Sequence, residues 1–294
     1  MSEEVKKDSP EELWQDCLLW AREKDNDFKE RCRVAGVNSE KLPLKELAAL
    51  PLQPKPEPSA SPFARLTLPL SGVARLMNST PYLVEEVDDW AQKSAFWLRS
   101  CGMTLASILL IADGLDGEGP GWGVLEGAKT MQTTVVSLSA RPWETVSECG
   151  ASACALTAEL LDGWVKSGEG PGTCRTFFCL TAGVSEEQRQ AWQKYLGYPV
   201  YLQWGLPGLQ ASLVAWECPQ GGGFHLPIDS FWPELIDPQT QELTVPGVAG
   251  ELVLTALRRR SSPAIRMRTG WAGRFAEKSC RCGSPYPKFI PEEF

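Results

Sequence analysis

Residues 216–225 have the sequence Trp-Glu-Cys-Pro-Gln-Gly-Gly-Gly-Phe-His, and this stretch contains the one histidine of the 294-residue chain, His225. Cys218 lies shortly before it, and a Cys-Arg-Cys-Gly turn follows at 280–283. Three thiolates and one imidazole are a complete tetrahedral ligand set for zinc, which leaves no open position for a catalytic water. A metal bound in this way would tie the two segments together and support folding. A lone histidine is also often a hydrogen-bonded loop residue, so the residues by themselves leave both interpretations open.

The composition is that of an ordinary globular protein. With 43% hydrophobic and 22% charged residues, the chain can bury a sizeable core in one large domain or two modest ones. The formal net charge of −8 argues against nucleic acid as the main partner, because phosphate binding needs clustered Lys and Arg. The only tight basic run is Arg258–Arg260.

The start of the chain and its cysteines indicate an intracellular setting. The first residues are charged and contain no apolar signal-peptide core, and no apolar run is long enough to span a bilayer. We therefore predict a cytoplasmic protein with no membrane contact, whose cysteines are mostly reduced. Those outside the 218, 280 and 282 set show no metal-type spacing and are interpreted as small core residues. They are Cys17, Cys32, Cys101, Cys149, Cys154, Cys174 and Cys179.

The first part of the chain predicts a helical arm over residues 1–55. Ser9-Pro10-Glu11-Glu12 is a capping box with proline at the first helical position, so a helix should begin there. A second short helix is expected near residues 44–50. The proline-rich segment 51–62 predicts a linker.

Residues 56–214 are predicted to form an α/β core. Short apolar runs alternate with amphipathic stretches, which favours a mainly parallel sheet with covering helices. We expect strands at 107–112, 133–138 and 176–180, and helices at 84–99, 143–166 (in one or two pieces) and 185–196.

The pattern changes after residue 214. Runs at 230–236, 241–245 and 250–257 are separated by Asp-Pro and Pro-Gly. This spacing predicts a β-hairpin-rich module over residues 215–294, which would contain the Cys/His set.

Several motifs of the second half share their order and spacing with one known family. They are Tyr201-Leu-Gln-Trp-Gly-Leu, Ala215-Trp-Glu-Cys-Pro, Gly223-Phe-His, Ile236-Asp-Pro, Gly250-Glu-Leu-Val-Leu-Thr-Ala-Leu, Ile265-Arg-Met-Arg-Thr-Gly and Cys280-Arg-Cys-Gly. Together they resemble the phenylacetate–CoA ligase group of AMP-forming acyl/aryl-CoA ligases, and a fainter similarity extends upstream through 50–55 and 83–90. The resemblance implies the fold of the large N-terminal domain of an adenylate-forming ligase. It also implies that the family's small C-terminal lid domain, which supplies an adenylation lysine, is absent from this sequence.

The resemblance also implies a metal. Members of the group are expected to hold a structural zinc through the positions that are Cys218, His225, Cys280 and Cys282 here. The C-terminal β-rich module would then be a zinc-containing module.

The positions that hold nucleotide in that family carry other residues in this chain. The family's phosphate loop, Ser-Ser-Gly-Thr-Thr-Gly-Lys-Pro, corresponds to Pro-Leu-Ser-Gly-Val-Ala-Arg at 69–75, without the threonines or the second glycine. The glutamate expected to hold Mg²⁺ is Gly208, and the acid expected to bind ribose is Trp271. A third acid, expected in a Gly-Ala-Glu motif, is Gly183. We interpret the remaining positions as a vestigial nucleotide cleft: Trp204, Gly205, Gly208, Trp271 and Arg274.

These departures predict the loss of ATP-dependent chemistry. Each missing charged contact is worth about 1.5–3 kcal/mol, so losing three removes several powers of ten from nucleotide affinity or rate if they add. ATP and Mg²⁺ are therefore not expected as ligands. No catalytic residue is predicted, because with the only histidine assigned to a metal, Ser–His and Cys–His pairs cannot form.

The leading hypothesis is a pseudoenzyme, a phenylacetate–CoA ligase-like protein that acts in binding or regulation with a structural zinc. Its expected partners are a second copy or an active ligase, with a small aromatic or acyl molecule as a candidate ligand. The alternative is a divergent aryl/acyl-CoA ligase or a CoA-dependent acyltransferase that uses a pre-activated substrate, which needs no ATP motif and keeps coenzyme A as a candidate. A scaffold with no ligand is the third hypothesis.

Overall fold

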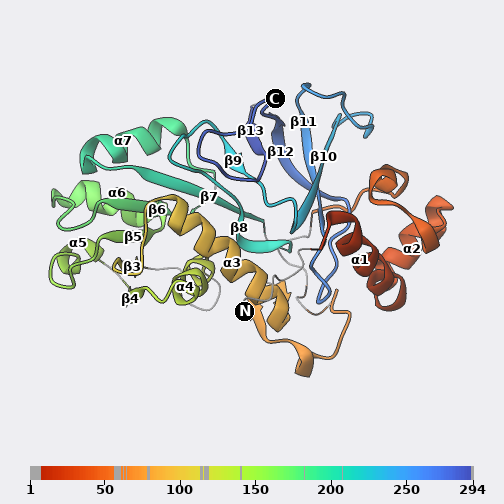
Figure 1. Cartoon of the computed structure of the whole chain (residues 1–294), viewed down its shortest axis with the longest axis horizontal. Helices are drawn as coiled ribbons and strands as arrows, with labels where there is room; N and C mark the ends of the chain where they lie inside the picture. Colours follow the sequence, from red (N-terminus) through yellow and green to blue (C-terminus); the bar gives the residue numbers. More distant parts are fainter. Residues whose placement is uncertain are drawn as a thin grey trace, which may run out of the picture. The chain divides into compact units, whose positions relative to one another are not determined.

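The computed structural model describes residues 8–55, 61, 63, 65–77, 80–112, 115, 119–139, 141–181, 183–206 and 208–292. The chain forms two compact units, and it passes between them more than once (Figure 1). Unit 1 takes residues 1–86, 227–277 and 291–294, and unit 2 takes residues 87–226 and 278–290.

Unit 1 begins with the predicted helical arm. Helix α1 (Pro10–Lys24) starts at the expected capping box, in which the Glu12 backbone N–H donates to Ser9 Oγ and the Ser9 N–H donates to the Glu12 carboxylate at 2.8 Å. Helix α2 (Asn26–Ala35) follows, and then the 3₁₀ helices η1 (Ser39–Lys41) and η2 (Leu44–Ala49). The second predicted helix is therefore confirmed as a 3₁₀ helix. The arm's apolar side chains form one cluster that also contains Leu257 and Ile265.

The start of the predicted linker is tied down. Gln53 is 3% exposed and forms a parallel bridge with Met267, the first residue of strand β12 (Met267–Phe275). The Gln53 N–H donates to Arg266 O at 2.8 Å, and the Arg268 N–H donates to Gln53 O at 2.9 Å. Apart from this bridge, residues 51–55 form no helix or strand, as the prolines predict, but backbone hydrogen bonds at Gln53 fix this end of the predicted linker. Residues 56–60 and 62 lie outside the described part.

The rest of unit 1 consists of short strands. After η3 (Leu70–Gly72), β1 (Arg75–Met77) pairs antiparallel with β2 (Thr80–Tyr82), and β10 (Phe231–Ile236), β11 (Gly250–Ala256) and β12 form an antiparallel meander. This confirms the strands predicted near 230–236 and 250–257. The predicted strand at 241–245 is wrong: within the described residues it contributes a single bridge, between Ile236 and Leu243. The Asp237 carboxylate accepts from the backbone of Gln239 and Thr240 and closes a turn instead.

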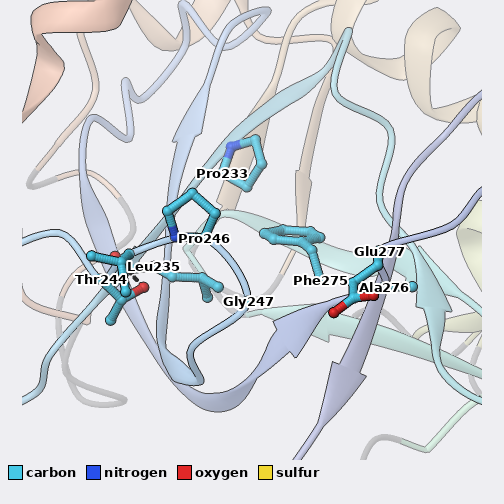
Figure 2. A pocket seen from close by; sticks show the side chains of 9 residues that line it. Pro233, Leu235, Thr244, Pro246, Gly247, Phe275, Ala276 and Glu277 are labelled. Atoms are coloured by element: carbon cyan, nitrogen blue, oxygen red, sulfur yellow. Dashed lines mark hydrogen bonds between the residues drawn. The ribbon is translucent and has the colours of Figure 1, made fainter.

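A hollow of about 510 Å³ opens on unit 1 beside β10 and the end of β12 (Figure 2). Pro233, Pro246 and Phe275 line it with apolar surface, and Glu277 is the only charged residue among the described residues that line it. The described lining residues thus offer one carboxylate and the Thr244 side chain, without a cation or a set of metal ligands.

Unit 2 is built on a mixed sheet whose strand order is β4-β3-β5-β6-β7-β8-β9-β13. The pairs from β4 to β7 are parallel, and those from β7 to β13 are antiparallel. The bounds are β3 (Ile108–Ala112), β4 (Thr134–Leu138), β5 (Ala153–Leu156), β6 (Thr176–Cys179), β7 (Val200–Leu206), β8 (Gln210–Trp216), β9 (Phe224–His225) and β13 (Lys288–Pro291). The predicted α/β core is confirmed, and its strands from β4 to β7 are parallel as expected; the antiparallel strands that follow β7 make the sheet as a whole mixed.

Helices cover both faces of this sheet. They are α3 (Val84–Ser100), α4 (Gly121–Thr130), α5 (Pro142–Thr145), α6 (Ala158–Ser167) and α7 (Glu186–Leu196). Successive side chains of a strand point to opposite faces, and in β6 Phe177 meets Trp164 of α6 while Phe178 meets Trp97 of α3. Helices α3 and α6 therefore lie on opposite faces. In the described part of the chain no helix has the length and apolar character that crossing a membrane requires.

One strand of the sheet falls inside a predicted helix. The stretch 143–166 contains two helical pieces, α5 and α6, which is one of the two expected arrangements, but strand β5 lies between them and was not predicted. Strand β5 has the sequence Ala-Cys-Ala-Leu and is buried at all four positions. A strand buried on both faces shows no alternation of polar and apolar residues, so its pattern cannot be told from that of a buried helix.

Candidate metal centre

The four predicted metal ligands come together in unit 2. Cys218 follows β8, His225 ends β9, and Cys280 and Cys282 precede β13; their ligand atoms all lie within 4.8 Å of one another. The Sγ atoms of Cys218 and Cys280 are 3.7 Å apart, and Cys282 Sγ is 3.2 Å from His225 Nε2. A tetrahedral zinc would separate two sulfurs by about 3.8 Å and a sulfur from a nitrogen by about 3.5 Å. The cluster therefore fits zinc in both donor type and spacing.

A run of three glycines brings His225 back to Cys218. Gly221, Gly222 and Gly223 have φ values of 58°, 70° and 120°, and the Gly221 N–H donates to Cys218 O at 2.9 Å. These backbone conformations favour glycine. At Gly223 a Cβ would lie 2.4 Å from the carbonyl oxygen of Phe289, so only glycine allows β9 to pair with β13 at this point.

The second pair of ligands lies on a tight turn. The Gly283 N–H donates to Cys280 O at 3.3 Å, and Gly283 has a φ of 78°. The Ser284 N–H donates to Cys282 Sγ at 3.4 Å. The turn thus gives both sulfurs a backbone donor, because the Cys282 backbone also donates to the Cys280 thiol.

The orientation of His225 suits a metal ligand. The side chain is fully buried at 0% exposure, and its Nδ1 lies 2.8 Å from the carbonyl oxygen of Tyr286. A carbonyl can only accept, so Nδ1 carries the proton and Nε2 presents its lone pair to the cysteines. Such a hydrogen bond to the second nitrogen is what fixes metal-binding histidines.

A lysine completes the centre. Lys288 is 8% exposed; its Nζ lies 3.5 Å from Cys218 Sγ and donates to Gly221 O at 2.5 Å. Burial acts to lower the pKa of Lys288, but the thiols of Cys280 and Cys218 raise it above its usual value overall. Zn²⁺ with three thiolates would carry one net negative charge, which this ammonium would balance.

The thiols themselves differ in acidity. Burial and the neighbouring thiols raise the pKa of Cys282 to about 11. Burial also acts to raise the pKa of Cys280, but donors that include the Cys282 backbone and Lys288 hold it below its usual value. Thiolates are the metal-binding form, so metal binding must displace protons from this cluster.

A hollow of about 360 Å³ adjoins the centre. Trp216 forms part of its wall and packs edge-on against Tyr286, with ring centroids 5.7 Å apart. The Trp216 indole N–H is buried and has no hydrogen-bond partner among the described residues. The lining residues are Phe96, Arg99, Ser100, Trp216, Cys218, His225, Cys282, Gly283 and Ser284.

The residues predicted as a nucleotide cleft are divided between the two units. In unit 2, Trp204 of β7 is 2% exposed, and Gly208 has a φ of 80° in the turn after β7. In unit 1, Trp271 and Arg274 lie in β12, and Arg274 forms an ion pair with Glu292 at 2.5 Å. Gly205 is half-buried in β7.

Sequence reasoning missed two members of the metal centre, Lys288 and the carbonyl of Tyr286. The available signal was a lysine in the apolar stretch Tyr-Pro-Lys-Phe-Ile at 286–290, where burial requires a partner for the charge. A backbone carbonyl leaves no trace in the sequence.

The fold is that of adenylate-forming acyl-CoA ligases. A solved structure of 2-hydroxyisobutyryl-CoA ligase in the postadenylation state matches with a TM-score of 0.83 over 99% of this chain and 67% of that chain, at 17% identity. A second, an open conformation with 2-HIB-AMP and CoA, matches with a TM-score of 0.82 over 95% of this chain and 67% of that chain, at 18% identity. No family model matches the sequence.

Curated relatives narrow the class. Phenylacetate–coenzyme A ligase of Aromatoleum evansii is 26% identical over 264 residues, which cover 82% of this chain and 60% of the relative. The enzyme of the same name from Pseudomonas putida is 25% identical with the same coverage. The chain is therefore similar to the phenylacetate–coenzyme A ligases over 82% of its length, as its motifs predict. It spans about 60% of the length of these relatives.

Proposed function

We propose that this protein is a non-catalytic relative of phenylacetate–coenzyme A ligase that contains a structural zinc and acts by binding. Its partner is a second copy or an active ligase. A small aromatic or acyl molecule is the candidate ligand. The observation that carries the proposal is the identity of Gly208 and Trp271 where the resemblance expects carboxylates. A ligase scaffold persists, while the groups expected to hold Mg²⁺ and ribose are replaced.

The zinc of this proposal is structural. Cys218, His225, Cys280 and Cys282 supply four ligands, which fill a tetrahedral shell and leave no position for a substrate or an activated water. The ion would join the end of β8 to the turn before β13. It would therefore contribute to folding rather than to a reaction.

Local structure at the replaced positions supports the loss of nucleotide chemistry. Gly208 has a φ of 80°, a conformation in which a glutamate would be strained. Arg268 and Gly270, which come just before Trp271, donate hydrogen bonds to the Glu251 carboxylate at 3.0 Å and 3.1 Å. These bonds fix the Arg-Thr-Gly turn, but the residue that follows it is a tryptophan in place of an acid.

Titration of the zinc-loaded protein with Mg²⁺–ATP by calorimetry tests this proposal. Losing carboxylate contacts worth about 1.5–3 kcal/mol each should weaken binding by several powers of ten relative to an active ligase. We expect no saturable heat up to millimolar ATP, with the Pseudomonas putida phenylacetate–coenzyme A ligase as the positive control. Saturable binding at micromolar ATP would overturn the proposal.

A CoA-dependent acyltransferase is the second candidate. It is favoured by the solved 2-hydroxyisobutyryl-CoA ligase that contains 2-HIB-AMP and CoA, because an acyltransferase with a pre-activated substrate would need only the CoA part of such a site. A parallel titration with coenzyme A decides between the two. Saturable CoA binding without ATP binding would favour the transferase, and the absence of heat would remove it.

A further inference from the structure

We propose that Cys282 is a modification site: it is the sulfur of the centre that electrophiles reach first, and its modification releases the metal. This inference rests on the zinc centre of the proposed function. It goes beyond that function because it assigns different chemistry to the three thiolates.

The three sulfurs differ in access. Cys218 is 2% exposed, whereas Cys280 and Cys282 are half-buried. Of the two half-buried residues, Cys282 lines the hollow beside the centre and Cys280 does not. A reagent that enters the hollow therefore meets Cys282.

The sulfurs also differ in their compensating charge. The Lys288 ammonium lies 3.5 Å from Cys218 Sγ and acts on the Cys280 thiol as well. Cys282 receives a neutral donor, the Ser284 N–H at 3.4 Å. A nearby cation draws electron density from a thiolate and lowers its nucleophilicity. Access through the hollow and the lack of a neighbouring ammonium thus both favour Cys282 as the most reactive of the three sulfurs.

The hollow is large enough for a small electrophile and has polar residues in its lining. Its volume is about 360 Å³, and its lining residues include the exposed Arg99 together with Ser100 and Ser284. Arg99 would attract anionic reagents, while the indole of Trp216 supplies an apolar wall.

Alkylation illustrates the chemistry. The Cys282 thiolate attacks the methylene carbon of iodoacetamide, a carbon–sulfur bond forms, the carbon–iodine bond breaks, and iodide leaves. The product is a neutral thioether. It is a weaker ligand than the thiolate, so the centre loses one of its four strong donors.

Limiting iodoacetamide on the purified, metal-containing protein tests the inference. Peptide mass spectrometry follows each cysteine, while a chromophoric chelator follows zinc in the same samples. We expect Cys282 to be alkylated before Cys218 and Cys280, with zinc released at the same rate. Cys149 is an internal reference, because it is half-buried and lies outside the centre, so its alkylation should leave the metal bound. Alkylation of Cys280 or Cys218 first, or zinc release that does not follow Cys282, would overturn the inference.

Two variants sharpen the test. Lys288→Met removes the compensating charge and should release zinc to the chelator about tenfold faster or more; Lys166→Met, at the exposed end of α6, is the matched control and should change nothing. Arg99→Gln should slow the reaction of Cys282 with anionic iodoacetate about two- to fivefold and leave that with neutral iodoacetamide unchanged. If each of the three cysteines reacted with iodoacetamide at the same rate in Lys288→Met as in the parent protein, the assigned role of the lysine would be contradicted.

Zinc content, measured before any alkylation, separates the two claims. Protein purified without metal would contradict the centre itself. Metal-loaded protein in which Cys282 is not the first cysteine modified would contradict this inference alone.

Discussion

At the scale of single residues, the contacts of His225 bear on two interpretations that the sequence leaves open. A hydrogen-bonded loop histidine and a metal ligand both suit a lone histidine after a glycine run. In the structure the Nδ1 atom hydrogen-bonds to Tyr286 O at 2.8 Å, and Nε2 lies 3.2 Å from Cys282 Sγ. Each nitrogen thus has a defined contact, and both contacts suit a metal ligand.

Replacing His225 with alanine should remove the metal and destabilise the fold. The variant leaves three crowded thiols without their fourth partner, so we expect substoichiometric zinc and a melting temperature lowered by roughly 5–15 °C. Elemental analysis and thermal unfolding measure both effects, and Cys149→Ala, outside the centre, should retain the full metal content. Full zinc occupancy in His225→Ala would show that the histidine is not a ligand.

At the scale of elements, the segment between β8 and β9 determines whether the centre can form. Strand β9 has two residues, Phe224 and His225, which pair with Phe289 and Lys288 of β13, and His225 also pairs with Trp216 of β8. So short a strand is held by its neighbours on both sides. The glycines before it make that approach sterically allowed.

Neighbouring glycines in this segment should respond very differently to alanine. Gly223→Ala places a Cβ 2.4 Å from Phe289 O at a φ of 120°, and should cost about 3 kcal/mol or more because the β9–β13 pair must separate. Gly222→Ala, at a φ of 70° with nothing within 4 Å, should cost about 1 kcal/mol. Chemical denaturation compares the two. A similar loss of unfolding free energy in both variants would mean that the close approach does not matter.

The sequence predicts elements well where the signal is local. Ser9 and Ser185 cap their helices through side-chain oxygens, which residue type and spacing reveal. Strand β5 is hidden because its four residues are all buried and small or apolar, and the segment at 241–245 fails as a strand because Asp237 closes a turn before it. These outcomes depend on tertiary burial and on a side-chain hydrogen bond that hydrophobic periodicity does not encode.

At the scale of the whole molecule, the metal ligands were easier to predict than the nucleotide positions. Three cysteines and one histidine are a complete zinc ligand set by residue type, and the family resemblance brings them together across a sequence separation of 62 from Cys218 to Cys280. Lys288 was not predicted from the sequence, because its role depends on which sulfur it lies beside in the fold. The nucleotide positions are inferred from acids that are missing, and an absent group predicts no geometry.

The central claim is that a ligase scaffold persists here without adenylation. The most direct measurement is single-turnover formation of acyl-adenylate on mixing the zinc-loaded protein at high concentration with Mg²⁺–ATP and phenylacetate, with released pyrophosphate measured in parallel. We expect neither product to exceed the level in buffer alone. Acyl-adenylate and pyrophosphate appearing together, in amounts comparable to the protein, would contradict it.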